Sequence, residues 1–62
     1  MNRVKDFRKN LGLSQLGLAK QIGVSRQTIN MIENNKYNPT LELCINLALA
    51  LKTDLNTLFW NK

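Results

Sequence analysis

Two serines and a glycine in the first half of the chain constrain its fold more than any other feature. Ser14 and Ser25 each precede apolar residues at helical spacing, and serine is a strong helix N-cap because its hydroxyl accepts a backbone N–H of the first turn. Gly23 lies between the two runs, where a left-handed residue can end a helix. These signals predict two short helices joined by a tight turn that sets them at a steep angle.

The remainder of the chain predicts three more helices and no strand. Apolar residues recur there at intervals of about 100°, the spacing of an amphipathic helix. The three predicted helices cover approximately residues 2–11, 41–51 and 55–60. Thr40 and Asp54 stand directly before the last two and are suitable N-caps. We therefore predict an all-α fold of five short helices, in one domain that spans residues 1–62.

The apolar stripes of these helices predict the core. The residues expected in it are Val4, Phe7, Leu11, Leu18, Ala19, Ile22, Ile29, Ile32, Leu41, Cys44, Ile45, Leu47, Ala48 and Leu51. Cys44 is interpreted as a small buried hydrophobe, with a redox switch as the alternative. Gly17 falls inside the second helix, where glycine costs about 1 kcal/mol relative to alanine. No neighbouring residue in the sequence compensates for that cost.

Composition excludes several classes of function. The chain has no histidine and one cysteine, so His-ligated metal, imidazole catalysis and an internal disulfide are excluded. No apolar run approaches the roughly 18 residues of a membrane span, and no signal peptide is evident. We expect a cytoplasmic protein of bacterial or phage origin that is not an enzyme and has no metal, cofactor or evident small-molecule ligand. A net charge of +5 favours a polyanionic partner.

The predicted third helix has an unusual outer face. Gln27, Asn30, Met31 and Asn34 face outward there, with Arg26 at the N-terminal end, whereas an ordinary solvent face favours Glu and Lys. Arginine pairs with guanine and glutamine with adenine, and methionine can pack against a thymine methyl group. We predict that this helix enters the major groove of double-stranded DNA and reads bases through Arg26, Gln27, Asn30 and Met31.

The pattern Leu-Gly-Leu-Ser-Gln-x-x-Leu-Ala-x-x-Ile-Gly-Val-Ser-Arg-Gln-Thr-Ile-Asn-x-Ile-Glu-Asn-x-Lys-Tyr-x-Pro-x-Leu resembles the lambda-repressor/Cro-like family, also called the xenobiotic-response-element (XRE) family. The similarity runs from Val4 to Phe59 and is most specific from Leu11 to Leu41. The resemblance implies a lambda-repressor-like helix-turn-helix domain that binds an inverted-repeat operator as a homodimer, usually as a repressor. The chain departs from the family pattern at two positions. Gly17 replaces an acidic or other helix-favouring residue, and Asn35 stands where glycine is common.

The resemblance also implies roles for individual residues. It supports base reading by the four residues named above. The candidates for contact with the DNA backbone are Gln15, Ser25, Thr28, Asn34 and Lys36. It further implies a structural ion pair between Arg8 and Glu33, and each of these residues does lie at the border of its helix's apolar stripe.

The C-terminal end carries more apolar side chains than so small a core needs. An exposed apolar patch usually marks an interface, so we predict a homodimer surface there. Its candidate residues are Leu49, Leu58, Phe59 and Trp60. The alternative to a DNA-binding regulator is an antitoxin-like or adaptor domain whose helix-turn-helix mainly meets another protein.

Overall fold

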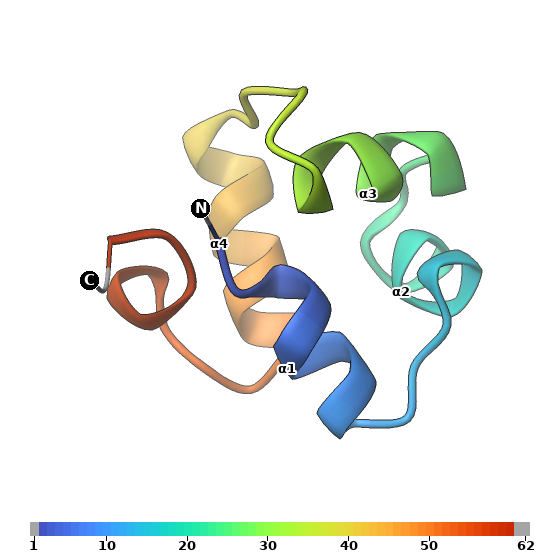
Figure 1. Cartoon of the computed structure of the whole chain (residues 1–62), viewed down its shortest axis with the longest axis horizontal. Helices are drawn as coiled ribbons and strands as arrows, with labels where there is room; N and C mark the ends of the chain where they lie inside the picture. Colours follow the sequence, from blue (N-terminus) through green and yellow to red (C-terminus); the bar gives the residue numbers. More distant parts are fainter. Residues whose placement is uncertain (1, 61–62) are drawn as a thin grey trace.

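The structure, a computed structural model, describes residues 2–60, so Met1, Asn61 and Lys62 of the predicted domain lie outside the described residues. Its elements are α1 (Val4–Asn10), α2 (Gln15–Ile22), α3 (Arg26–Glu33), α4 (Leu41–Ala50) and the single π-helical segment η1 (Asn56–Trp60). Figure 1 shows α2 and α3 together at one end of the molecule and η1 at the other, with α1 and α4 between them. The predicted all-α fold with five helical elements is confirmed.

The local signals in the sequence correspond to real helix ends. The side-chain oxygens of Ser14, Ser25, Thr40 and Asp54 each accept the backbone N–H of the residue three positions later, at 2.7–3.2 Å. Gly23 ends α2 in the left-handed conformation, with φ of 77°. The α2–α3 connection is therefore short and held at both ends, which restricts how α3 can sit on α2.

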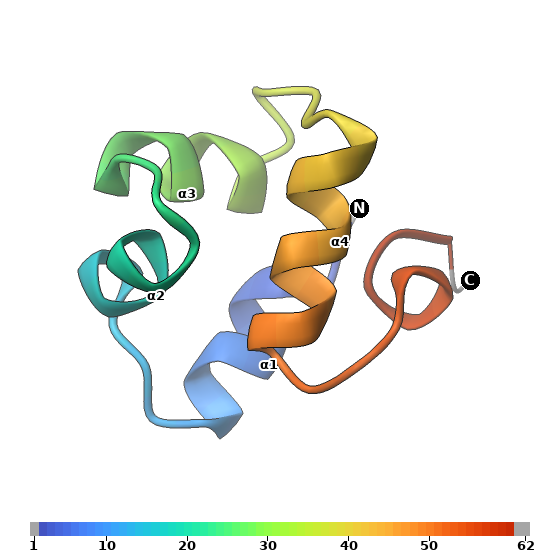
Figure 2. The ribbon, with the colours of Figure 1, turned by 180° about the vertical axis from the view of Figure 1, so that it is seen from behind.

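The core draws on every helical element, which ties the small domain together. Its buried apolar residues are Val4, Leu18, Ala19, Ile29, Ile32, Leu47, Ala48, Leu51 and Leu58. Contacts are most extensive between α2 and α3, and α4 packs against α2 (Figure 2). Packing against α2 and the core thus sets the orientation of the short helix α3.

Three residues that the apolar stripes predicted as buried are exposed. Leu11 follows the end of α1 and lies at its C-cap, outside the helical stripe. Leu41 and Ile45 lie on the outer side of α4, and Leu41 is 64% exposed. Since eight of the ten residues of α4 are apolar, its periodicity does not distinguish a buried face from an exposed one.

Candidate nucleic-acid interface

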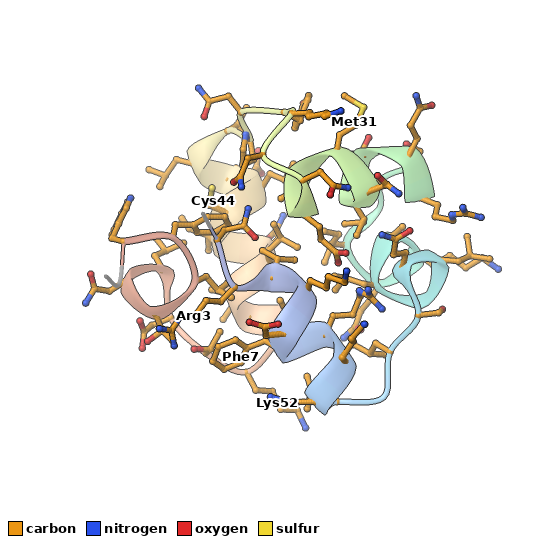
Figure 3. The ribbon with its side chains drawn as sticks, in the orientation of Figure 1. Arg3, Phe7, Met31, Cys44 and Lys52 are labelled. Atoms are coloured by element: carbon orange, nitrogen blue, oxygen red, sulfur yellow. The ribbon has the colours of Figure 1, made fainter. Side chains whose placement is uncertain are left out.

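The outward face of α3 carries the four predicted base readers. Two isoleucines of this helix are buried in the core, so the opposite side faces solvent. Arg26, Gln27 and Asn30 are exposed, and Met31 is partly exposed. Met31 points away from the body of the molecule in Figure 3. The structure therefore brings the predicted readers together on one accessible helix face, as a major-groove helix requires.

Hydrogen bonds at the two ends of α3 involve one of the readers, Asn30, and three candidates for contact with the DNA backbone. Ser25 Oγ accepts the Thr28 N–H at 3.1 Å and lies 2.9 Å from Thr28 Oγ1, so both hydroxyls take part in the N-cap. Near the other end, the Asn34 amide donates to the backbone oxygen of Asn30 at 2.8 Å and to its Oδ1 at 2.9 Å. A side chain held in place before binding loses less conformational entropy on binding, which favours recognition.

A buried ion pair holds the C-terminal end of α3 against α1. Arg8 Nε donates to Glu33 Oε2 at 2.7 Å and Arg8 Nη2 donates to Glu33 Oε1 at 3.2 Å. The two side chains are only 9% and 2% exposed. Arg8 Nη1 also donates to the Leu13 carbonyl at 2.8 Å, in the connection between α1 and α2. The predicted Arg8–Glu33 pair is present, and it joins three parts of the chain.

Gln15 belongs to the same network, which the sequence did not indicate. Gln15 Nε2 donates to Glu33 Oε1 at 3.1 Å, so the first residue of α2 is tied to the last residue of α3. A contact between Gln15 and a phosphate, as the resemblance implies, would use the second amide hydrogen. That contact stays a prediction.

The turn after α3 is restrained by the N-terminal segment, another feature that sequence reasoning missed. Asn35 adopts the left-handed conformation with φ of 57°, and the next residue, Lys36, donates its N–H to the Met31 carbonyl at 2.8 Å. Asn2 Nδ2 donates to the Ile32 carbonyl at 2.7 Å and to Asn35 Oδ1 at 3.0 Å. Lys36 itself is exposed beside this turn.

The electrostatics of α3 suit a polyanion. Glu33 is the only acidic residue of this helix, and it is buried against the Arg8 guanidinium. The exposed side of α3 therefore carries the Arg26 charge and amides without any carboxylate. In the part of the chain that the structure describes, no helix is long and apolar enough to cross a membrane, and no cluster of ligating side chains could hold a metal ion.

A model of the helix-turn-helix family matches residues 4–58. The chain belongs to this family. The helix-turn-helix chain is 37% identical over 59 residues to YgzD of Bacillus subtilis, an uncharacterized HTH-type transcriptional regulator, covering 95% of this chain and 89% of the relative. An HTH-type transcriptional regulator of Archaeoglobus fulgidus is 40% identical over 57 residues, with 92% and 81% covered.

Solved structures of similar regulators support the same assignment. SinR in complex with DNA matches with a TM-score of 0.81 and 30% identity, covering 89% of each chain. The restriction-modification controller protein C.AhdI from Aeromonas hydrophila matches with a TM-score of 0.85 and 33% identity, covering 92% of this chain and 86% of that one. A chain of the SinR/SinI protein complex matches with a TM-score of 0.86 and 30% identity, covering 95% of this chain and 58% of that one.

The helix-turn-helix chain is thus a DNA-binding transcriptional regulator of the XRE/Cro-lambda-like type, and it is not an enzyme. Its lambda-repressor-like fold is confirmed. Because one of the relatives comes from an archaeon, the similarity does not restrict the regulator to a bacterial or phage source.

The predicted dimer surface needs one correction. Leu58 is only 1% exposed because η1 turns its side chain into the core, so its inclusion in an exposed patch was wrong. The Leu58 carbonyl accepts the Arg3 N–H at 2.9 Å, which attaches η1 to the N-terminal segment. Leu49 and Trp60 are 72% and 62% exposed, and Phe59 is half-buried and packs against the core.

Sequence reasoning missed two further members of this exposed surface. Leu41 and Ile45 precede Leu49 by eight and four residues, so the three side chains form one stripe along α4. A hollow beside this stripe has a volume of about 320 Å³. Its lining residues are Asn38, Pro39, Leu41, Cys44, Phe59 and Trp60. The exposed apolar surface therefore continues from α4 to η1.

Cys44 is one of the residues that line that hollow. It is half-buried and not fully buried as predicted, and burial raises the pKa of its thiol. A raised pKa keeps the thiol protonated near neutral pH, and the protonated thiol is the unreactive form. This chemistry suits the interpretation of Cys44 as a packing residue better than a redox switch.

Proposed function

We propose that this regulator is a repressor that binds an inverted-repeat operator as a homodimer, with α3 of each protomer in the major groove. The single observation that carries the proposal is the exposed face of α3. It presents one arginine and a series of amides, lacks any exposed carboxylate, and is held from behind by the buried Arg8–Glu33 pair. These are the properties of a rigid base-reading helix.

Within this proposal the exposed and half-buried residues at the start of α2 and on α3 divide into two groups. Arg26 reads a guanine and Gln27 an adenine through paired hydrogen bonds, while Asn30 and Met31 contact neighbouring bases. The backbone contacts come from residues at the start of α2 and at both ends of α3. They are Gln15, Ser25, Thr28, Asn34 and Lys36. Backbone contacts set the position on the duplex, whereas base contacts supply the sequence preference.

The dimer is proposed from size and from the exposed apolar surface. The Cα extents of one protomer are 27 × 22 × 19 Å, and successive major grooves on one side of DNA are about 34 Å apart. One protomer therefore cannot place helices in both grooves. The stripe of Leu41, Ile45 and Leu49, extended by Phe59 and Trp60, is a surface through which two copies could associate while α3 stays free (Figure 1).

Selection of bound sequences from a random duplex pool tests this proposal. We expect an inverted repeat whose half-sites are centred about 10 base pairs apart, with two protomers bound per site in sedimentation. An unsymmetrical site bound by one protomer would contradict the homodimer. The proposed repressor acts in the cytoplasm by excluding the polymerase from a promoter. A selected site placed at a promoter should therefore lower expression from it when the regulator is present, and higher expression would contradict the repressor role.

A second candidate function is binding of another protein through the same apolar surface. It is favoured by the high exposure of Leu49 and Trp60, and SinR, a structural relative, occurs in a complex with SinI. Leu49→Asp distinguishes the two roles of this surface. If the variant is monomeric in sedimentation, the surface holds the homodimer together. If its molecular mass equals that of the wild type, the surface is available to a different partner.

A further inference from the structure

The side chain of Asn2 connects three parts of the regulator. Its Oδ1 accepts the Val4 N–H at 3.0 Å at the start of α1, while its Nδ2 donates to the Ile32 carbonyl and to Asn35 Oδ1. The acceptor half of the amide thus serves α1, and the donor half holds the last turn of α3 and Asn35, which follows the C-cap of that helix.

Asn2 is itself held firmly. The N–H of the adjacent Arg3 donates to the Leu58 carbonyl at 2.9 Å, and Leu58 is a fully buried residue of η1. The N-terminal segment is therefore attached to the core immediately beside Asn2. A side chain anchored in this way can restrain its hydrogen-bond partners.

The partner Asn35 controls the direction of the chain that leads to Lys36. Asn35 has a positive φ, a conformation in which glycine is usually preferred. An asparagine has a property here that glycine lacks, because its Oδ1 can accept a hydrogen bond, and it does accept one from Asn2. The departure from the family pattern at this position therefore corresponds to a specific contact.

We infer that Asn2 is a positioning residue for DNA binding, which holds the Asn35–Lys36 turn so that the Lys36 ammonium meets a phosphate. This inference rests on the backbone contact assigned to Lys36 in the proposed function. A restrained turn fixes the Cα–Cβ direction of Lys36 and so limits the region that its ammonium can reach, whereas a free turn would leave that direction variable.

Three variants separate this role from a purely structural one. Asn2→Ser keeps a side-chain oxygen that can cap α1, but its side chain is too short to reach both Ile32 and Asn35. Asn35→Gly keeps the positive φ and removes the side chain whose Oδ1 accepts the hydrogen bond from Asn2. Lys36→Gln removes the charge, and Lys52→Gln is its control, because Lys52 lies at the opposite end of the molecule from Met31 (Figure 3).

The measurement is affinity for a random-sequence duplex as a function of salt, for variants shown to be folded by circular dichroism. Lys36→Gln should reduce the magnitude of the negative slope of log K against log salt by about 0.9 per protomer, and Lys52→Gln should leave it unchanged. Asn2→Ser and Asn35→Gly should each reduce this magnitude by a substantial part of that amount. Added to Lys36→Gln, neither should reduce it further, because the contact that they support is already gone.

The outcomes are distinct. If Asn2→Ser and Asn35→Gly reduce only the melting temperature, or weaken binding equally with and without Lys36, the positioning role is overturned while the Lys36 contact stands. If Lys36→Gln leaves the slope unchanged, the assigned phosphate contact is wrong and the positioning role fails with it. If the wild-type protein does not bind the duplex at low salt, the proposed function itself is contradicted.

Discussion

Replacing Arg8 with methionine should remove most of the stability of the domain. The variant leaves the Glu33 carboxylate, whose side chain is 2% exposed, without its guanidinium partner and with Gln15 as its remaining donor. Breaking a buried ion pair by removing one partner costs about 3–5 kcal/mol. At 0.05–0.15 kcal/mol per residue, a stretch of 62 residues corresponds to a total stability of about 3–9 kcal/mol. The loss is therefore comparable with the whole.

Urea unfolding followed by far-ultraviolet circular dichroism measures this loss. Arg8→Met and Glu33→Met should each lower the free energy of unfolding by about 3–5 kcal/mol, and the double variant should lose less than either, because no buried charge is left unpaired. Lys5→Met, an exposed position on the same helix, is the control and should stay within about 0.5 kcal/mol of wild type. Single variants as stable as this control would refute the claim that the pair ties α1 to α3.

Three further predictions concern the dimer surface and two helix starts. Leu49→Asp should shift a dimer to monomers in sedimentation equilibrium, because it puts a charge into an apolar contact; an unchanged mass would exclude Leu49 from the interface. Gly17→Ala should raise the free energy of unfolding by less than the usual gain of about 1 kcal/mol, since the new Cβ would lie 3.1 Å from Ser14 Oγ, and a full gain would contradict this close contact. The Thr57 N–H holds the pKa of Asp54 below its ordinary value, so this cap stabilises the fold above the unfolded-state pKa and is lost as pH falls through the folded-state pKa. Asp54→Asn should weaken the acid dependence of the unfolding midpoint, and an unaltered dependence would contradict the assignment.

Features of the fold that depend on neighbouring residues could be predicted from the sequence. Ser14, Gly23 and Ser25 act within one helical turn, so their residue types alone indicate the ends of α2 and α3. The exposure of the predicted readers on α3 could be predicted in the same way. A helix with one apolar and one polar side packs its apolar side against the core, so its polar side faces solvent. The Arg8–Glu33 pair was predicted from the family pattern together with its position at two stripe borders.

Features that depend on distant parts of the chain could not be predicted in this way. Gln15 and Glu33 are separated by 18 residues, and Asn2 and Asn35 by 33, so nothing local indicates that they meet. The burial of Leu58 and the exposure of Ile45 depend on where η1 docks relative to α4. An almost wholly apolar α4 offers several possible docking sides, and only the assembled core selects among them.

The ratio of affinities for a selected operator and a random duplex tests the central claim, that α3 reads bases, most directly. The account predicts that Arg26→Ala lowers this ratio by about five- to 150-fold, the equivalent of about 1–3 kcal/mol, because it removes a base contact. Lys36→Gln should weaken binding to both duplexes and leave the ratio nearly constant. If Arg26→Ala weakens binding to both duplexes equally, α3 does not read sequence through Arg26, and the account is contradicted.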